Sequence, residues 1–234
     1  MHFEDIADRV SEVRQRIAAA VIRGGHGQHV TIVAVTKTHG VDAVRAAWDA
    51  GLHDVGENRV QEALHKMDAT DLPLRWHLVG HLQRNKVKVV DRFALVHSID
   101  SERLAVAVHE HGVARGSPVE VLIQVNVSGE TTKGGFIPSE LTQFAERLPR
   151  LEGITVRGAM TMAPLDAAPH VLHEVFARAR DARDALAECW GRGAGQGEGV
   201  TELSMGMSND YEVAVEEGAT MVRLGTILFG ARAP

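Results

Sequence analysis

The sequence has little cysteine and no long hydrophobic run, and each shortage excludes a class of protein. Cys189 is the only cysteine among 234 residues, so an internal disulfide is excluded, and its place in a predicted helix disfavours a catalytic thiol. No apolar run approaches the ~20 residues that span a membrane as a helix. The first five residues also lack a basic stretch leading into an apolar core. We therefore expect a cytoplasmic protein.

An excess of positive charge is also missing. The formal net charge is -6, and the acidic and basic residues are interspersed along the chain. No basic stripe is available to a phosphate backbone, so we expect no nucleic acid partner. The apolar share of 44% supports a sizeable core, and the length fits one large α/β domain or two small ones.

Strand and helix signals alternate along the chain. Ile6, Val10, Val13, Ile17 and Val21 recur at helical spacing and predict a helix that precedes the first strand. The predicted strands cover 30–36, 53–55, 76–79, 94–97, 119–126, 154–160, 202–204 and 221–224. The helices predicted after them cover 41–50, 58–67, 85–91, 101–113, 139–148, 169–190 and 209–217. A segment rich in glycine, 191–199, is predicted to be a flexible surface loop.

About eight β-α units in this length predict a single (β/α)8 TIM barrel over residues 1–234, with an extra N-terminal helix. A doubly wound sheet is the alternative. It is disfavoured because Thr38-His39-Gly40 follows the first strand, where a dinucleotide-binding sheet carries a glycine-rich fingerprint. In a barrel, functional groups gather at the C-terminal ends of the strands. Candidates at those ends are Lys37, Asn58, His77, His81, His97, Asn126, Met160, Ser208 and Arg223.

Lys37 is the most informative of these residues. It closes a strand that is apolar on both faces, so its amine leaves the end of a central parallel strand. Burying an ammonium without a partner is costly, and an amine at this place suits Schiff-base chemistry. The alternative is a lysine that extends to solvent without a function.

The ends of the last two strands indicate an anion site. Ser204-Met205-Gly206-Met207-Ser208 leads into a helix, and Arg223-Leu224-Gly225-Thr226 leads into the last turn of the sequence. Helix N-termini offer unpaired N–H donors, and barrels often bind phosphate after strands seven and eight. Glycine at 206 and 225 would let an anion approach the backbone closely. The alternative is that Ser208 or Asn209 caps a helix and Gly225 forms a turn.

A reactive lysine and a phosphate site across one barrel mouth suit pyridoxal phosphate, whose aldehyde and phosphate lie on opposite flanks of its ring. Arg223 then gains a role, because a guanidinium only donates hydrogen bonds and would keep a pyridine nitrogen unprotonated. The ring would then be a weaker electron sink.

Several motifs in order resemble the pyridoxal-phosphate homeostasis proteins, the single-barrel relatives of the alanine racemase N-terminal domain. They are Ala34-Val35-Thr36-Lys37, Gly56-Glu57-Asn58-Arg59-Val60-Gln61-Glu62, His77-Leu78-Val79-Gly80-His81-Leu82-Gln83-Arg84-Asn85-Lys86, Leu203-Ser204-Met205-Gly206-Met207-Ser208 and the closing Met221-Val222-Arg223-Leu224-Gly225-Thr226. The resemblance covers nearly the whole chain.

The resemblance implies a covalent aldimine between pyridoxal 5′-phosphate and Lys37. It also implies that Ser208, Gly225 and Thr226 hold the phosphate, that Arg223 faces the pyridine nitrogen and that Asn58 lies beside the ring. Met160 and Met207 are expected to line the ring pocket, while His81 and Asn85 lie in a family motif without a clear role. We expect neither a catalytic residue nor a metal site.

The resemblance further implies a protein that maintains intracellular vitamin B6 and amino-acid pools, with delivery of cofactor to apoenzymes as an additional hypothesis. Alanine racemase uses a lysine and a tyrosine from a second domain as its two bases. Here Tyr211 is the only tyrosine and follows the expected phosphate loop, so the second base is missing. A weak racemase that uses pyridoxal phosphate, or an aldolase that uses Lys37 alone, is the alternative. We also expect a monomer. The glycines around Lys133 would let that loop close over the cofactor, and the alternative is an ordinary solvated loop.

Overall fold

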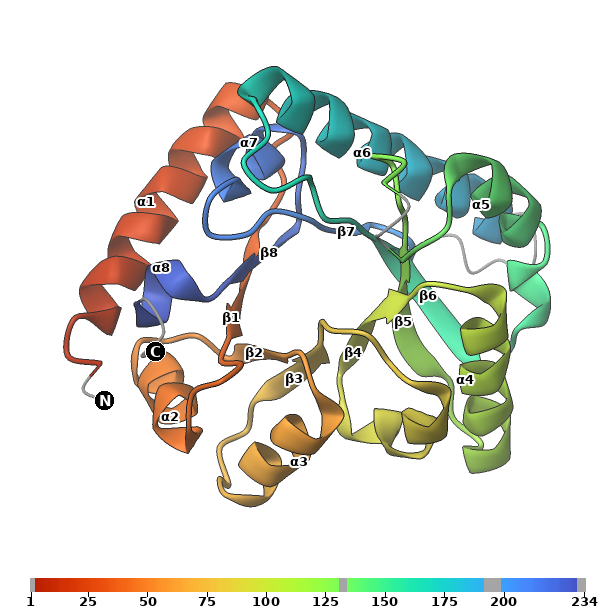
Figure 1. The fold of residues 1–234 in the computed structure, drawn as a ribbon, viewed down its shortest axis with the longest axis horizontal. Helices are drawn as coiled ribbons and strands as arrows, with labels where there is room; N and C mark the ends of the chain where they lie inside the picture. The colour runs from red at the N-terminus through yellow and green to blue at the C-terminus, as the bar shows by residue number, and fades with distance from the viewer. Residues whose placement is uncertain (1–2, 131–133, 192–198, 231–234) are drawn as a thin grey trace.

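Eight parallel strands form a closed barrel in which each strand pairs with its neighbours in sequence order and β8 returns to β1 (Figure 1). The computed structural model describes residues 3–130, 134–191 and 199–230. The strands are β1 Thr31–Val35, β2 Asp54–Glu57, β3 Arg75–Leu78, β4 Leu95–Ile99, β5 Val119–Gln124, β6 Ile154–Met160, β7 Glu202–Ser204 and β8 Met221–Leu224. The (β/α)8 barrel predicted from the sequence is confirmed.

An outer layer of helices surrounds the barrel (Figure 1). The helices are α1 Ile6–Gly24, α2 Val41–Asp49, α3 Val60–Asp68, α4 Glu102–Arg115, α5 Pro138–Ala145, α6 Pro169–Gly191, α7 Tyr211–Glu216 and α8 Thr226–Phe229, with 3-10 helices η1 Arg84–Arg92 and η2 Leu148–Arg150. No helix in these described ranges is both long and apolar enough to span a bilayer.

Most element predictions agree with the structure, and the differences are local. The helix predicted at 85–91 is the 3-10 helix η1, and β5 ends at Gln124. Helix α8 was not predicted, because four residues are too few for a helical period to be visible in the sequence. Of the predicted loop at 191–199, residues 192–198 lie outside the described part of the chain.

The predicted N-terminal helix, α1, completes the outer layer beside the last two β-α units. Helices α7 and α8 contain only six and four residues, so neither can cover the outside of β7 and β8 alone. Helix α1 lies along both of them in Figure 1 and buries Ile6, Val10, Val13, Ile17 and Ala20. The first helix of the chain therefore packs against its last two helices beside β7 and β8.

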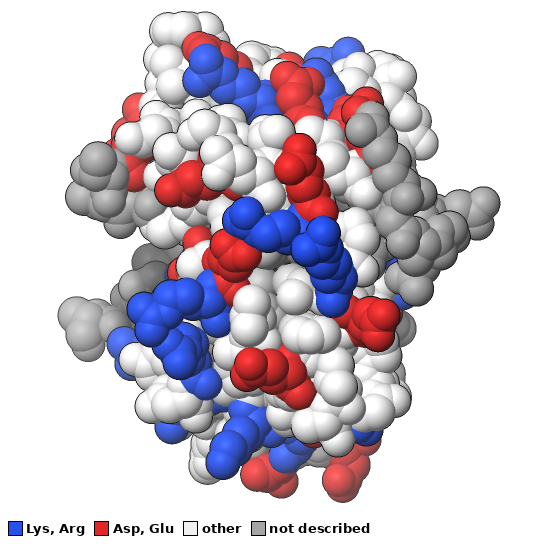
Figure 2. Space-filling view, turned by 90° about the vertical axis from the view of Figure 1, so that its right-hand side faces the viewer, with Lys and Arg blue, Asp and Glu red and all other residues white. Residues whose placement is uncertain are grey.

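The outer face on the side of α4 and α5 carries both charge signs. Acidic and basic side chains alternate across it in Figure 2, without an extended area of one sign. Arg147 and Glu102 form one of its ion pairs, at 2.8 Å.

The inside of the barrel contains both apolar and polar side chains. Val33, Leu95, Leu122, Met160 and Met221 form a small buried cluster that is separate from the larger core between the strands and the helices. Fully or nearly fully buried polar side chains also occur on the strands, namely His77, His97, Ser204 and Arg223. Buried polar groups need hydrogen-bond partners, so their contacts connect the fold to the site.

Candidate functional site

A cavity of about 610 Å³ opens at the C-terminal ends of the strands. The segments that follow β1, β2, β3, β6, β7 and β8 line it. All seven residues proposed from the sequence as cofactor-binding residues lie in its wall: Lys37, Asn58, Met207, Ser208, Arg223, Gly225 and Thr226. The fold therefore brings together side chains from four separate sequence motifs.

Lys37 reaches the cavity from the turn that follows β1, two residues after the strand ends. Buried contacts hold the residue before it. The Thr36 carbonyl accepts a hydrogen bond from Lys66 Nζ at 2.8 Å, and the Thr36 hydroxyl donates a short one to Glu57. Lys66 comes from α3 and Glu57 from β2, so two neighbouring elements fix the backbone from which Lys37 extends.

The residue after Lys37 is held as well. Thr38 has a φ of 68°, in the left-handed region that a β-branched residue rarely adopts. Its backbone N–H donates to Glu62 Oε1 at 2.6 Å, and the same oxygen accepts from Lys66 Nζ at 2.8 Å. Unusual backbone conformations persist where the surroundings enforce them, and they concentrate at functional sites. Lys37 is thus anchored on both sides by one charged network.

Burial dominates the electrostatics of this network. It raises the pKa of the Glu57 carboxyl, and the hydrogen bonds from Lys66 and Thr36 only partly offset that effect. Lys66 lies in the helix predicted at 58–67, and its side chain is only 3% exposed. A lysine in a helix gives no sign that its ammonium points inward, so this network could not be found from the pattern alone.

Asn58 follows β2 and packs closely against the segment after β3. A Cβ atom on Gly80 would lie 2.2 Å from the backbone oxygen of Asn58, so only glycine fits there. Ser98 supports the same place by donating its hydroxyl to the Gly80 carbonyl at 2.7 Å. The close approach of these two loops sets the position of Asn58 in the cavity wall.

The loops after β7 and β8 meet at Ser208. Its hydroxyl accepts a hydrogen bond from the backbone N–H of Ile227 at 3.3 Å, which leaves its own hydrogen available to a ligand. Gly225 is the N-cap of α8, and Thr226 begins the first turn, where N–H groups lack partners within the helix. Together they can bind an anion through one hydroxyl and backbone donors.

Arg223 lies at the back of the cavity and is almost fully buried. Its Nη1 donates to the carbonyl and the hydroxyl of Ser204 at 2.8 and 2.7 Å, and its Nη2 donates to the Thr161 carbonyl at 2.8 Å. Burial lowers its pKa to about 10, and the charge of Asp210 opposes that shift. The guanidinium therefore stays protonated at neutral pH and acts only as a donor.

Two expectations drawn from the sequence need correction. Met160 does not line the cavity, because its side chain packs into the apolar cluster inside the barrel, and Met162 is in the wall instead. Gly206 is also absent from the wall. Its φ is 89°, and a Cβ there would lie 2.6 Å from that of Ala214, so glycine is required for packing against α7.

One wall of the cavity was missed by the sequence analysis. The loop after β6 contributes Met162 to Ala167, and it includes Asp166 with a φ of 53°. An apolar run immediately after a predicted strand is the only signal that could have indicated it. Asp210 was missed too, and its carboxylate accepts the Met207 N–H at 2.5 Å.

Other candidates lie away from the cavity. His77 and His97 are buried inside the barrel, whereas His81 pairs with Asp100 at 3.0 Å beside a second hollow that also contains Asn85. Tyr211 is buried at the start of α7, where burial raises the pKa of its hydroxyl. The proposed lid falls on Lys133, which is outside the described residues.

The cavity combines an amine, a buried guanidinium and an anion-binding pair of loops around a partly apolar interior. Such a set can hold a flat ligand that carries an aldehyde and an anionic group on opposite sides. Within the described ranges, no group of three or more histidine, cysteine, aspartate or glutamate residues could hold a metal ion.

Comparisons with known proteins agree with this geometry. The profile of the family described as "Alanine racemase, N-terminal domain" matches residues 10–233. The chain is 42% identical to a pyridoxal phosphate homeostasis protein of Pseudomonas aeruginosa over 97% of this chain and 96% of that protein. It is 40% identical to the pyridoxal phosphate homeostasis protein of Aquifex aeolicus, over 96% of this chain and 97% of that protein.

A solved structure with pyridoxal phosphate bound is also similar. It is PipY of Synechococcus elongatus, which is 38% identical to this chain with a TM-score of 0.81, over 96% of this chain and 100% of that one. The structure of the same protein without the cofactor gives a TM-score of 0.83.

Proposed function

The chain belongs to the family of pyridoxal phosphate homeostasis proteins, and on that basis we propose that it binds pyridoxal 5′-phosphate and helps maintain vitamin B6 and amino-acid pools. The observation that carries the proposal is the convergence of Lys37, Ser208 and Arg223 on one cavity. We further propose that the whole chain, 1–234, acts as one cofactor-binding unit in the cytoplasm and as a monomer.

The cavity residues fit the cofactor in three places. The Lys37 amine would condense with the aldehyde and release one water, giving a Schiff base. Ser208, Gly225 and Thr226 would bind the phosphate, because a hydroxyl and first-turn N–H groups all donate to an anion. When bound, the cofactor supplies an electron-withdrawing ring to an attached amine.

Arg223 and Asn58 would set the position and the electronics of the ring. Three hydrogen bonds to Ser204 and Thr161 occupy three of the five guanidinium N–H donors, so two remain for a ring nitrogen. A donor that does not give up its proton keeps that nitrogen unprotonated. Asn58 and Met207 would contact the ring from the loops after β2 and β7.

We propose that the protein holds the cofactor without robust catalysis of its own. Racemisation needs an acid/base group on each face of the ring. Tyr211, the candidate considered from the sequence, is 3% exposed and is not part of the cavity wall. These positions support a carrier over a two-base enzyme.

Exchange of the α-proton tests the alternative of a weak racemase. Purified holoprotein would be incubated with alanine or serine in deuterated buffer, with Lys37→Ala as the control. We expect no exchange above the rate given by free cofactor. Exchange that is present in wild type and absent in Lys37→Ala would establish an enzyme. An aldolase that uses Lys37 alone would instead cleave its substrate without added cofactor.

Delivery to apoenzymes is a further part of the proposal. The cavity is open at the mouth of the barrel, so bound cofactor would remain accessible to a recipient. An apoenzyme that depends on pyridoxal phosphate would be mixed with stoichiometric holoprotein or with the same amount of free cofactor. Faster activation by the holoprotein supports delivery, and equal or slower activation contradicts it.

A further inference from the structure

A chain of hydrogen-bonded side chains runs inside the barrel between Arg223 and Asp54. Its links are Arg223 Nη1 to Ser204 Oγ at 2.7 Å, Ser204 Oγ to His97 Nδ1 at 2.9 Å, His97 Nε2 to His77 Nδ1 at 2.9 Å, and His77 Nε2 to Asp54 Oδ1 at 2.9 Å. We call these five residues the barrel relay.

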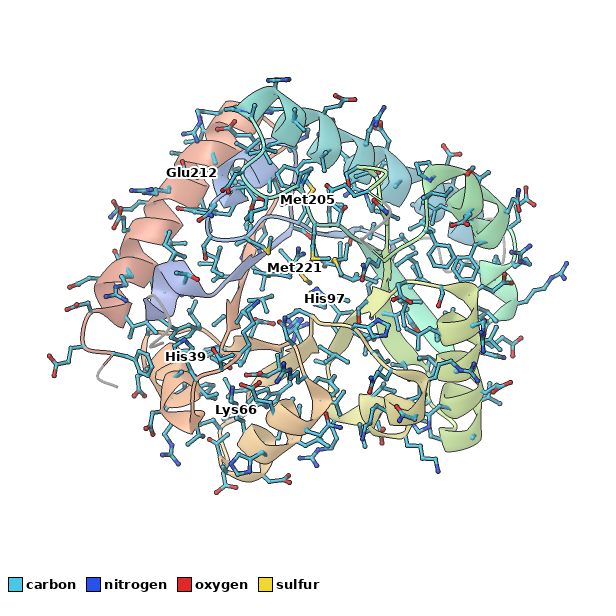
Figure 3. The ribbon with its side chains drawn as sticks, viewed as in Figure 1. His39, Lys66, His97, Met205, Glu212 and Met221 are labelled. Atoms are coloured by element: carbon cyan, nitrogen blue, oxygen red, sulfur yellow. The ribbon has the colours of Figure 1, made fainter. Side chains whose placement is uncertain are left out.

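The barrel relay connects opposite ends of the barrel. Asp54 is the first residue of β2, whereas Arg223 lines the cavity at the C-terminal ends of the strands. His97 lies near the centre of the barrel in Figure 3. Its partner Ser204 belongs to β7, three strands away from β4, so this link crosses the interior.

Burial makes each link necessary. His77, His97 and Ser204 are essentially inaccessible to solvent, so a lost partner could not be replaced by bulk water. An unsatisfied buried polar group costs more free energy than a hydrogen bond contributes when formed. The side chains are therefore confined to arrangements in which every link is made.

With two neutral imidazoles, only one arrangement of protons satisfies every link of the barrel relay. A guanidinium can only donate and an ionised carboxylate can only accept. Ser204 therefore accepts from Arg223 and donates to His97 Nδ1, His97 donates from Nε2 to His77 Nδ1, and His77 donates from Nε2 to Asp54. In this arrangement each imidazole carries its single proton on Nε2.

The electrostatics agree with this assignment. Burial, with the charge of Arg223 acting in the same direction, holds the pKa of His97 well below its usual value, so that ring is neutral. Burial tends to raise the pKa of Asp54, but the hydrogen bond from His77 outweighs it with help from Arg75, so the carboxyl is ionised. The relay thus has a fixed cation at one end and a fixed anion at the other.

We propose that Asp54, His77 and His97 are positioning residues for Arg223. They orient the Ser204 hydroxyl, which in turn fixes which guanidinium donors remain directed at the cavity. A substitution at Asp54, at the opposite end of the barrel, then changes how a ligand is held in the cavity. The part of this inference that concerns pyridoxal phosphate rests on the proposed function.

The first test needs no cofactor. Long-range ¹H–¹⁵N spectra of the imidazole side chains distinguish the two neutral tautomers, with His77→Asn and His97→Asn variants to assign the signals. We expect both rings of the wild type to carry the proton on Nε2, and Asp54→Ala to alter the signals of His77 and His97. Wild-type rings protonated on Nδ1, or signals unchanged in Asp54→Ala, would overturn the proposal.

The matched control is Glu120→Ala. Glu120 also lies near the N-terminal end of its strand, β5, and pairs with Arg157 at 2.6 Å, but it is not part of the barrel relay. Thermal melts of each variant establish that it is folded. The control should leave the signals of both histidines unchanged.

The second test measures cofactor affinity by absorption titration. Asp54→Ala should weaken binding about tenfold, the scale found when an outer partner of a ligating residue is lost. Asp54→Asn keeps an acceptor for His77 and should stay within about twofold of wild type. Equal affinity of Asp54→Ala and Glu120→Ala, or an Asp54→Asn variant as weak as Asp54→Ala, would contradict the relay. If wild type binds no cofactor, the proposed function fails, while the tautomers still test the relay.

Discussion

Lys66 and Glu57 form an ion pair inside the protein, with 2.6 Å between Nζ and Oε1 and side chains that are 3% and 0% exposed. The same ammonium donates to the carbonyl of Thr36, the residue before Lys37. The pair therefore supports the backbone that carries the proposed cofactor lysine. Lys66 is thus a buried amine with a structural role of its own, whereas Lys37 is only partly buried.

Removing one member of this pair should destabilise the fold strongly. Lys66→Met leaves the Glu57 carboxylate buried without its cation, which typically costs about 3–5 kcal/mol. Urea denaturation measures the loss, and Lys88→Met on the surface of η1 is the control, with a change within about 0.5 kcal/mol. The double variant Lys66→Met/Glu57→Gln should recover part of the loss. A single variant as stable as wild type would contradict the role of the pair.

Replacing Gly80 tests the close packing that positions Asn58. The Cβ of Gly80→Ala would lie 2.2 Å from the Asn58 oxygen, so the two loops must separate, at a cost of about 2 kcal/mol or more. Gly40→Ala is the control, because no atom lies within 4 Å of its added Cβ. It should lose less than about 1 kcal/mol as a change of N-cap. Equal thermal stability of the two variants would rule out the steric account.

Stability should fall as the pH drops below about 6.5 because of His97. Its folded pKa is lowered by burial, so below the ordinary histidine value the unfolded chain takes up a proton that the folded chain does not. One such group contributes about 1.4 kcal/mol per pH unit.

Urea denaturation at pH 7.5 and 5.5 measures this dependence. His97→Asn should lose less stability between the two values than wild type does, whereas His29→Asn, at an exposed position, should behave like wild type. An unchanged difference in His97→Asn would show that another group is responsible.

The role of Ser208 can be separated from that of the rest of the cavity. Ser208→Ala removes a hydroxyl expected to donate to the phosphate, so affinity for pyridoxal phosphate should fall about tenfold or more. Pyridoxal has no phosphate and should bind both proteins equally. Equal weakening of both ligands would indicate a general disturbance of the cavity instead of a phosphate contact.

The sequence predicted the barrel because strands and helices alternate over its whole length, and a regular period is visible without tertiary information. It also placed Lys37, Ser208 and Arg223 at the barrel mouth, where all three line the cavity, since Lys37 and Ser208 follow recognisable strands and Arg223 lies in the last one. The network of Lys66 and Glu57 was not visible, because the direction of a helical side chain depends on what packs against it. The same holds for Met160, whose side chain points into the barrel although its neighbour Met162 reaches the cavity.

The barrel relay shows a second limit of sequence patterns. His77 and His97 were recognised at strand ends, but their link to Ser204 crosses the barrel between β4 and β7. His97 and Ser204 are 107 positions apart in the sequence, and only the closed geometry of the barrel brings them together.

The most direct test of the account is the absorption spectrum of the purified protein with pyridoxal phosphate, followed by borohydride reduction and mass mapping of the peptides. We expect the absorption band of a Schiff base, and a cofactor adduct on Lys37 that is absent in Lys37→Ala. No band, or an adduct confined to other lysines such as Lys88, would contradict the proposal that this cavity holds the cofactor.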